Sequence, residues 1–224
     1  MARRLNRKKV VMQTITLNVI GTTPLLMNNP VTINPLLPVT KAIKELTSKK
    51  RKTDADQEEI FRLKYSAALY RDESGPYIPS TWLWKSGLEG ARKTKQGKEW
   101  EAGVQVRAVR MPLEYVGPRD VNGLYADSDF VDVRNGRIGT SRVPVVRPTF
   151  PHWQFEATFD IDDDIMNPRD ALTAIHTAGR RIGLGTYRQQ FGRFRLEVVS
   201  ASVNLSPLCD QLDIPILGKK VKAA

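Results

Sequence analysis

Apolar and polar residues alternate in three stretches of the chain, and each stretch predicts a half-buried β-strand. The first covers residues 11–20, the second covers residues 153–161, and the third begins at Phe194. Alternate side chains of a strand point to opposite faces, so each stretch has one apolar and one polar face. The three stretches therefore predict a sheet with one face turned to the core.

Between these strands, apolar residues recur at three- and four-residue spacing, which is typical of helices. Residues 39–70 contain one such region with a charged break in its middle. A further helix is expected to be capped by Ser80 or Thr81 and to end near Lys95. A third begins after residue 167, where an Asn-Pro pair is a common helix start.

The segment after residue 130 has the pattern of a β-hairpin. Alternating residues lead into Asn135-Gly136, a pair that favours a tight two-residue turn. Arg134, Arg137 and Arg142 lie beside this turn. We therefore predict a basic hairpin that is long enough to reach over a bound strand or onto a neighbouring protomer.

The element order predicts an α+β fold, namely a ferredoxin-like (RRM-like) antiparallel sheet with helices on one face and a hairpin finger as an insertion. We expect one such domain over residues 11–205. Its helical insertion covers about 39–95 and its hairpin insertion about 104–148. A basic arm at 1–10 and a basic tail at 206–224 are expected to flank it.

Charge points to a polyanionic partner. The chain has 35 Lys and Arg against 24 Asp and Glu, a net charge of +11. Basic clusters fall at residues 3–9, 49–52 and 219–222. This excess favours nucleic acid as the partner.

Membrane insertion and a disulfide framework are not expected. No apolar run approaches the roughly 18 residues that span a membrane. A single cysteine, Cys209, fits a reducing cytoplasm.

A glycine-rich segment joins the third helix to the last strand and is the main candidate for ligand binding. Glycine allows a backbone to approach a ligand closely, arginine holds phosphate, and an aromatic ring can stack on a base. The candidate residues are Gly183, Gly185, Tyr187, Arg188, Gly192 and Arg193, with Phe191 as a second ring. A tight structural turn is the alternative. The segment follows a helix and lacks a Gly-Lys-Ser/Thr sequence, so it is neither a dinucleotide fingerprint nor a P-loop.

Candidates for catalysis and metal binding are few. The two histidines, His152 and His176, are far apart in the sequence, and no nucleophile accompanies them at a suitable spacing. Acidic residues cluster only at 160–164, where alternation divides them between two faces of a strand. We predict neither a metal nor another cofactor.

Three segments together resemble the repeat-associated RNA-binding (RAMP) superfamily, which supplies backbone and processing subunits of CRISPR effectors. They are the strand leading into residues 21–27, the segment 77–92, and the glycine-rich segment 183–195. The second is similar to the superfamily's turn-and-helix motif, although Ser80 replaces a glycine and two tryptophans follow it. The resemblance implies that Ser80, Lys85 and Arg92 face RNA. The departures and the short chain fit a stand-alone, phage-borne relative.

We accordingly predict a non-catalytic protein that binds single-stranded nucleic acid, RNA in preference to DNA, and oligomerises along it in the cytoplasm like a CRISPR effector backbone subunit. Other effector subunits are further candidate partners. Two alternatives stay open. One is a metal-independent endoribonuclease that uses His152 or His176, and the other is a single-stranded DNA-binding or annealing protein.

Overall fold

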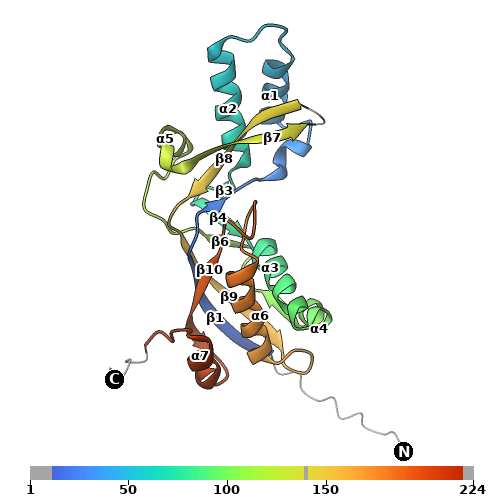
Figure 1. Ribbon diagram of the computed structural model, residues 1–224, viewed down its shortest axis with the longest axis vertical. Helices are drawn as coiled ribbons and strands as arrows, with labels where there is room; N and C mark the ends of the chain where they lie inside the picture. The colour runs from blue at the N-terminus through green and yellow to red at the C-terminus, as the bar shows by residue number, and fades with distance from the viewer. Residues whose placement is uncertain (1–11, 139–140, 219–224) are drawn as a thin grey trace, which may run out of the picture.

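The computed structural model describes residues 12–138 and 141–218. The basic arm and the lysines near residue 220 lie outside the described residues. The protein is elongated (Figure 1). A four-stranded sheet with its helices forms the lower part, which we call the sheet lobe, and the inserted elements form the upper part, the hairpin lobe.

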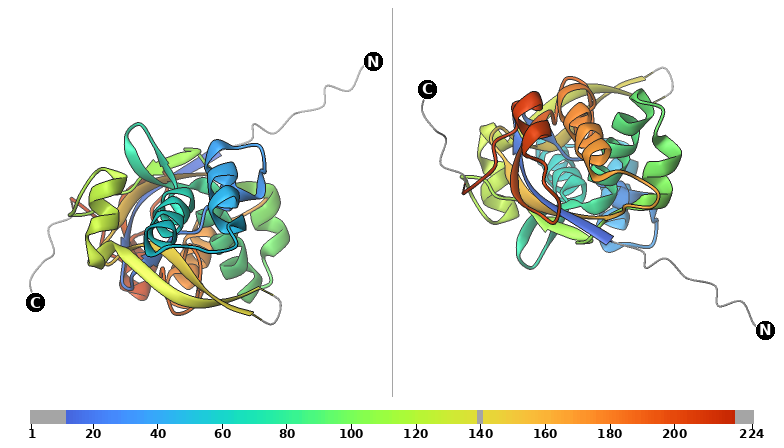
Figure 2. Two further views of the ribbon diagram at one scale, coloured as in Figure 1. Left: turned by 90° about the horizontal axis from the view of Figure 1, so that it is seen from above. Right: turned by 90° about the horizontal axis from the view of Figure 1, so that it is seen from below.

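The sheet lobe has the predicted ferredoxin-like topology. Its strands are antiparallel and run in the order β10-β1-β9-β5, with one helix crossing between β1 and β5 and another between β9 and β10. Both helices lie on the same side of the sheet, packed against each other (Figures 1 and 2). The elements are β1 (Met12–Gly21), α3 (Ser80–Lys93), β5 (Val104–Val106), β9 (Gln154–Asp162), α6 (Pro168–Arg181) and β10 (Phe194–Ala201).

The core of this lobe follows the alternation in the sequence. Ile15, Leu17 and Val19 of β1 are fully buried, whereas the polar residues between them are partly exposed. Phe155 and Phe159 of β9 are buried on the same face. Each such side chain contributes roughly 1.5–3 kcal/mol by leaving water. Two short helices, α4 (Gly97–Gly103) and α7 (Ser206–Leu212), complete the sheet lobe.

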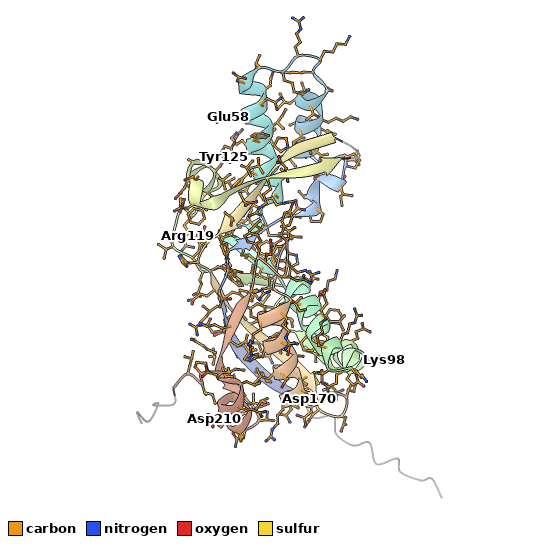
Figure 3. All side chains as sticks on the ribbon, viewed as in Figure 1. Glu58, Lys98, Arg119, Tyr125, Asp170 and Asp210 are labelled. Atoms are coloured by element: carbon orange, nitrogen blue, oxygen red, sulfur yellow. The ribbon has the colours of Figure 1, made fainter. Side chains whose placement is uncertain are left out.

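The hairpin lobe is built mainly from residues of the two predicted insertions, but the predicted bounds need correction. The insertions of about 39–95 and 104–148 also contained α3 and β5, which belong to the sheet lobe, because β5 pairs with β9 and α3 packs on α6. Strand β8 is the middle strand of the sheet β2-β8-β7, and helix α2 packs against it. Between the lobes lies a small sheet, β3-β4-β6. The hairpin lobe contains β2 (Leu25–Leu26), η1 (Pro30–Ile33), α1 (Pro38–Ser48), α2 (Asp54–Ala68), α5 (Val121–Ala126), η2 (Ser128–Phe130), β7 (Val131–Ile138) and β8 (Ser141–Phe150), and the small sheet contains β3 (Arg71–Asp72), β4 (Gly75–Pro79) and β6 (Arg110–Pro112). In Figure 3, Glu58 marks the upper helices, and Lys98, Asp170 and Asp210 mark the lower end.

The charged break in the first helical region separates α1 from α2. Thr53 and Asp56 form a capping box at the start of α2, and Lys49 donates a hydrogen bond of 2.6 Å to Asp56. These bonds, that from Lys49 above all, lower the pKa of Asp56 to about 2. The helix dipole also stabilises the negative charge of Asp56, which lies near the helix N-terminus. The charged break is thus an ordered turn that hydrogen bonds hold between the two helices.

The predicted hairpin turn is wrong. Asn135 and Gly136 lie within β7, where they pair with Pro144 and Val143, and the strands extend to the pair Ile138–Ser141. Neither residue of the Asn-Gly pair has the positive φ that such a turn requires. The register is anchored at the other end, where Phe130 and Phe150 are buried with ring centroids 5.8 Å apart. That anchorage overrides the local preference of Asn-Gly.

Two further expectations about local structure are corrected. The N-cap residue of α3 is Pro79 and not Ser80 or Thr81. Its side chain accepts no hydrogen bond from the first turn of the helix. Residues after 205 are not all tail, because α7 buries Cys209, and Ile216 forms a parallel bridge with Val198 at the edge of β10. Apolar contact with the sheet therefore fixes this segment.

Candidate nucleic-acid interface

The glycine-rich loop (residues 183–192) joins α6 to β10 and is fixed to the segment after β1. The Thr186 N–H donates to the Leu26 carbonyl at 3.0 Å, and the Gly192 N–H donates to the Pro24 carbonyl at 2.8 Å. Within the loop, the Leu184 N–H donates to the Gly192 carbonyl at 2.9 Å. The first two of these bonds join segments that are remote in the sequence, and the third closes the loop on itself.

The three glycines of the loop are explained by packing inside the protein. Gly183, Gly185 and Gly192 have φ values of +81°, +74° and +68°, a region that favours glycine. A Cβ on Gly185 would overlap the carbonyl oxygen of Leu26, and one on Gly192 would overlap that of Leu184. Our interpretation that these glycines open the backbone to a ligand is therefore replaced by a structural one. The features of the loop that suit a ligand are therefore its side chains.

A buried serine, which the sequence reasoning missed, holds the loop to α3. The Ser86 side chain is fully buried, and its hydroxyl donates to the Gly183 carbonyl at 2.9 Å. The only signal in the sequence was a serine on the otherwise small and apolar face of the helix. Ser86 thus positions the loop from the side of the sheet lobe.

The hairpin and the glycine-rich loop meet in what we call the arginine–aromatic cluster: Arg134 of β7, Arg147 of β8, and Tyr187 and Phe191 of the loop. The Arg134 guanidinium lies 4.5 Å from the Phe191 ring centroid and 5.6 Å from that of Tyr187. The Arg147 guanidinium lies 4.7 Å from the Tyr187 centroid. Such distances allow cation–π attraction, worth about 0.5–2 kcal/mol each.

The two arginines of the cluster differ in their partners. Arg134 donates to both carboxylate oxygens of Asp132 at 2.8 Å. Arg147 lies directly opposite Asp132 in the ladder, yet its Nε and Nη1 are buried and have no hydrogen-bond partner among the described residues. An unsatisfied donor in a buried position costs about 1–3 kcal/mol, and more when it is charged. Arg147 is therefore a charged group whose buried donors have no acceptor among residues 12–138 and 141–218.

Arg147 and Tyr187 line a cavity of ≈ 410 Å³ between the hairpin, α2 and the segment after β2. This volume lies within the range of about 300–1,000 Å³ that is usual for ligand sites. Lys64 adds a second cation to its wall, and Asn28 and Asn29 add amide groups. Among the described residues, the Lys64 ammonium has no ion pair or hydrogen bond. The cavity thus combines cations, an aromatic face and amides.

The remaining predicted residues lie around this cluster or away from it. Arg188 reaches back to Glu89 of α3 at 2.9 Å, and the Arg193 Nε donates to the Gln189 carbonyl at 2.6 Å. Arg92 pairs with Glu101 at 3.0 Å. Arg92 lies twelve positions after Ser80 in α3, about 18 Å along the helix, so the two residues are at opposite ends of α3.

The Ser80 N–H is not free to bind a phosphate, because it donates to the Val109 carbonyl at 3.0 Å. Lys85 is exposed on α3. Arg137 and Arg142 face each other as a pair in the ladder, and their side chains lie outside the described part of the structure. The cluster therefore gathers Arg134, Tyr187 and Phe191, which the sequence had marked, and adds Arg147.

The two histidines lie in different places. His152 is exposed beside Trp153, and His176 lies half-buried on α6; each lines a separate cavity. In the described residues, no group of three or more His, Cys, Asp or Glu side chains is placed to hold a metal ion. Asp160 of the acidic stretch is ion-paired with Arg107, which lowers the pKa of that carboxyl group. In the same residues, no helix combines the length and the apolar character needed to cross a membrane.

Comparisons with known proteins found similarity of structure but no match of sequence. No family model matches the chain, and no curated protein matches it. Among solved structures, it is similar to a chain in the cryo-EM structure of the Type III-B Cmr-beta bound to cognate target RNA, with a TM-score of 0.48 and 15% identity. The match covers 84% of this chain and 61% of that chain, so this chain spans less than two thirds of that chain's length. The α+β topology described above is that of the fold which the sequence resemblance implies, and the superfamily itself stays a prediction.

Proposed function

We propose that the protein binds single-stranded nucleic acid, RNA in preference to DNA, at the arginine–aromatic cluster. The observation that carries this proposal is Arg147, whose buried Nε and Nη1 have no partner in the described structure although the side chain borders an open cavity. A phosphate oxygen would satisfy such donors, since guanidinium binds phosphate by charge-assisted hydrogen bonds.

The rest of the cavity wall suits the other parts of a nucleotide. Tyr187 is 42% exposed, so part of its ring is free for a base to stack on it. Lys64 supplies charge for a second phosphate, and the amides of Asn28 and Asn29 can bond base edges or a ribose hydroxyl. Single-stranded ligands fit this arrangement best, because stacking on a protein ring needs an unpaired base.

An affinity measurement on two matched arginine variants tests the proposal. Arg147→Gln removes the guanidinium of the cluster. Arg110→Gln removes a guanidinium that also lies over a tyrosine ring, at 5.0 Å from the Tyr77 centroid, but is ion-paired with Asp72 at 3.3 Å. Both variants lose one positive charge, so a general effect of net charge acts on both alike.

We expect Arg147→Gln to weaken binding of a labelled single strand about ten- to a hundredfold, the equivalent of about 1.5–3 kcal/mol for a hydrogen bond to a charged group. Arg110→Gln should weaken it less than about threefold, as expected for one diffuse charge. Equal losses in the two variants at equal thermal stability would refute the assignment of the cluster. Length-matched RNA and DNA in the same assay test the preference for RNA, and the recovered strand shows whether it has been cleaved.

We further propose that several protomers share one strand, as in a CRISPR effector backbone. The hairpin supports this proposal, because Val133 of β7 is 57% exposed although it stands in the apolar phase of the strand. A neighbouring protomer would cover such a surface, and a head-to-tail array need not close. Particle mass measured on strands of increasing length should rise in steps. A constant mass of one protomer would exclude the array and leave binding intact.

A further inference from the structure

A second basic cavity lies in the sheet lobe, at the outer edge of β10. It has a volume of ≈ 690 Å³ and lies between α6, β10 and the segment that follows α7. His176 and Arg180 come from α6, and Arg193 and Arg195 come from the start of β10. Asp213, with a left-handed backbone, is the one acidic residue in its wall.

One of the three arginines of this cavity is ion-paired, and the other two have no carboxylate partner among the described residues. Arg195 pairs with Glu197 at 2.6 Å, and Arg193 uses its Nε for the uncharged Gln189 carbonyl. Arg180 is exposed and has no ion pair among the described residues. The cavity wall thus includes three arginines and one carboxylate, that of Asp213. This excess of positive charge favours an anion.

The edge of β10 adds a backbone donor. The Val198 N–H and carbonyl point away from β1, since they bond Pro215 and Leu217. Backbone direction alternates along an antiparallel strand, so the groups of Leu196 point the same way, toward the cavity it lines. No described residue bonds the Leu196 N–H there. An anion between the arginines could accept from this group as well.

We propose that this cavity binds a phosphate group, as a site separate from the arginine–aromatic cluster. The group is either a free phosphate or the phosphodiester of a strand whose other nucleotides occupy the cluster. Guanidinium groups and a backbone N–H are the usual ligands of phosphate oxygens. Arg180 is the main phosphate ligand, because binding the phosphate breaks no ion pair of Arg180 with a described residue.

The half-buried His176 reports on occupancy. Burial and, next, the Arg180 charge lower its pKa. A phosphate beside it raises the pKa again, since an opposite charge favours the protonated ring. The other charged groups of the cavity wall are Arg193, Arg195 and Asp213. For a phosphodiester, which keeps its single negative charge near neutral pH, binding therefore strengthens as pH falls through the His176 pKa.

Histidine-selective NMR tests this proposal, because the chain has two histidines. The exposed His152 lies in another cavity and serves as an internal control. The titration is run once in inorganic phosphate and once in chloride of the same ionic strength. In phosphate we expect the His176 pKa to be higher by about 1 unit, while the His152 signals are the same in both buffers. Arg180→Gln should abolish the rise. Arg181→Gln, the next residue of α6, is exposed and outside the cavity wall, and should preserve it.

A second titration with a single-stranded oligonucleotide distinguishes the sources of the phosphate. A His176 shift with the oligonucleotide that is lost in Arg147→Gln indicates one strand that spans both sites. A shift with inorganic phosphate alone indicates a separate small-anion site. The proposal is overturned if neither probe moves the His176 pKa, or if Arg180→Gln and Arg181→Gln behave alike. The phosphate titration contains no nucleic acid, so its failure leaves the function of the cluster untouched.

Discussion

The serine beneath the glycine-rich loop gives the sharpest test of how the site is held in place. In Ser86→Ala the hydroxyl that donates to the Gly183 carbonyl is removed, while the small side chain stays buried. The two residues are 97 positions apart, so this one bond links α3 directly to the loop. The substitution creates a negligible cavity, and its main consequence is a carbonyl group without a partner.

The expected cost follows from the burial of that carbonyl. Gly183 is buried, and among the described residues its oxygen accepts no other hydrogen bond. Leaving a buried acceptor unsatisfied costs about 1–3 kcal/mol, more than the net value of about 0.5–1.5 kcal/mol for an ordinary hydrogen bond. In a protein of this size each kcal/mol lowers the melting temperature by about 2–4 °C.

Denaturant unfolding of Ser86→Ala and of a matched control measures this effect. The control is Thr173→Ala, which removes a hydroxyl that bonds the Arg169 carbonyl within α6 and is only partly buried. We expect its stability to stay within about 0.5 kcal/mol of the parent. The single-strand affinity of Ser86→Ala should also fall, because the loop that carries Tyr187 loses its buried bond to α3 and keeps the exposed Arg188–Glu89 ion pair. If the two variants are equally stable, our account of the loop is wrong.

Three further outcomes are expected. Gly185→Ala should destabilise the protein by more than the roughly 1–3 kcal/mol of a strained left-handed residue, because its Cβ also meets the Leu26 carbonyl; unfolding curves that match the parent would contradict this. Arg107→Gln should cost up to about 1 kcal/mol at pH 7, the value of an exposed ion pair. The pKa of Asp160 is lowered from 3.8 mainly by its hydrogen bond to Arg107, so this stabilisation exists above that pH and is lost as pH falls through the lower folded-state value; a deficit that persists at the lowest pH would refute the assignment. Single-strand affinity should fall with salt with a logarithmic slope of about −2 for three phosphate contacts, and titrations at several NaCl concentrations would show a flat response if phosphates are not bound.

The alternation of apolar residues determined the strands of the sheet lobe. Ile15, Leu17 and Val19 are buried as the period of two requires, because such a pattern leaves a strand one way to face the core. The helices followed from their spacing in the same way, and the order of the elements then gave the ferredoxin-like topology. These properties depend on neighbours in the sequence, so the sequence alone was enough.

The site depended on contacts between remote segments. Arg147 was not a candidate, since nothing near it in the chain marks it, and it became one only because the hairpin places it on Tyr187 beside a cavity. The glycines of the loop were correctly identified as special, but their reason is the Leu26 and Leu184 carbonyls, which no local pattern reveals. The Asn135-Gly136 preference yielded to the buried aromatic pair that sets the hairpin register. Local preference is worth about 1 kcal/mol or less, whereas burial of two phenylalanine side chains is worth several times as much, and for that physical reason the tertiary structure decided where the turn and the site lie.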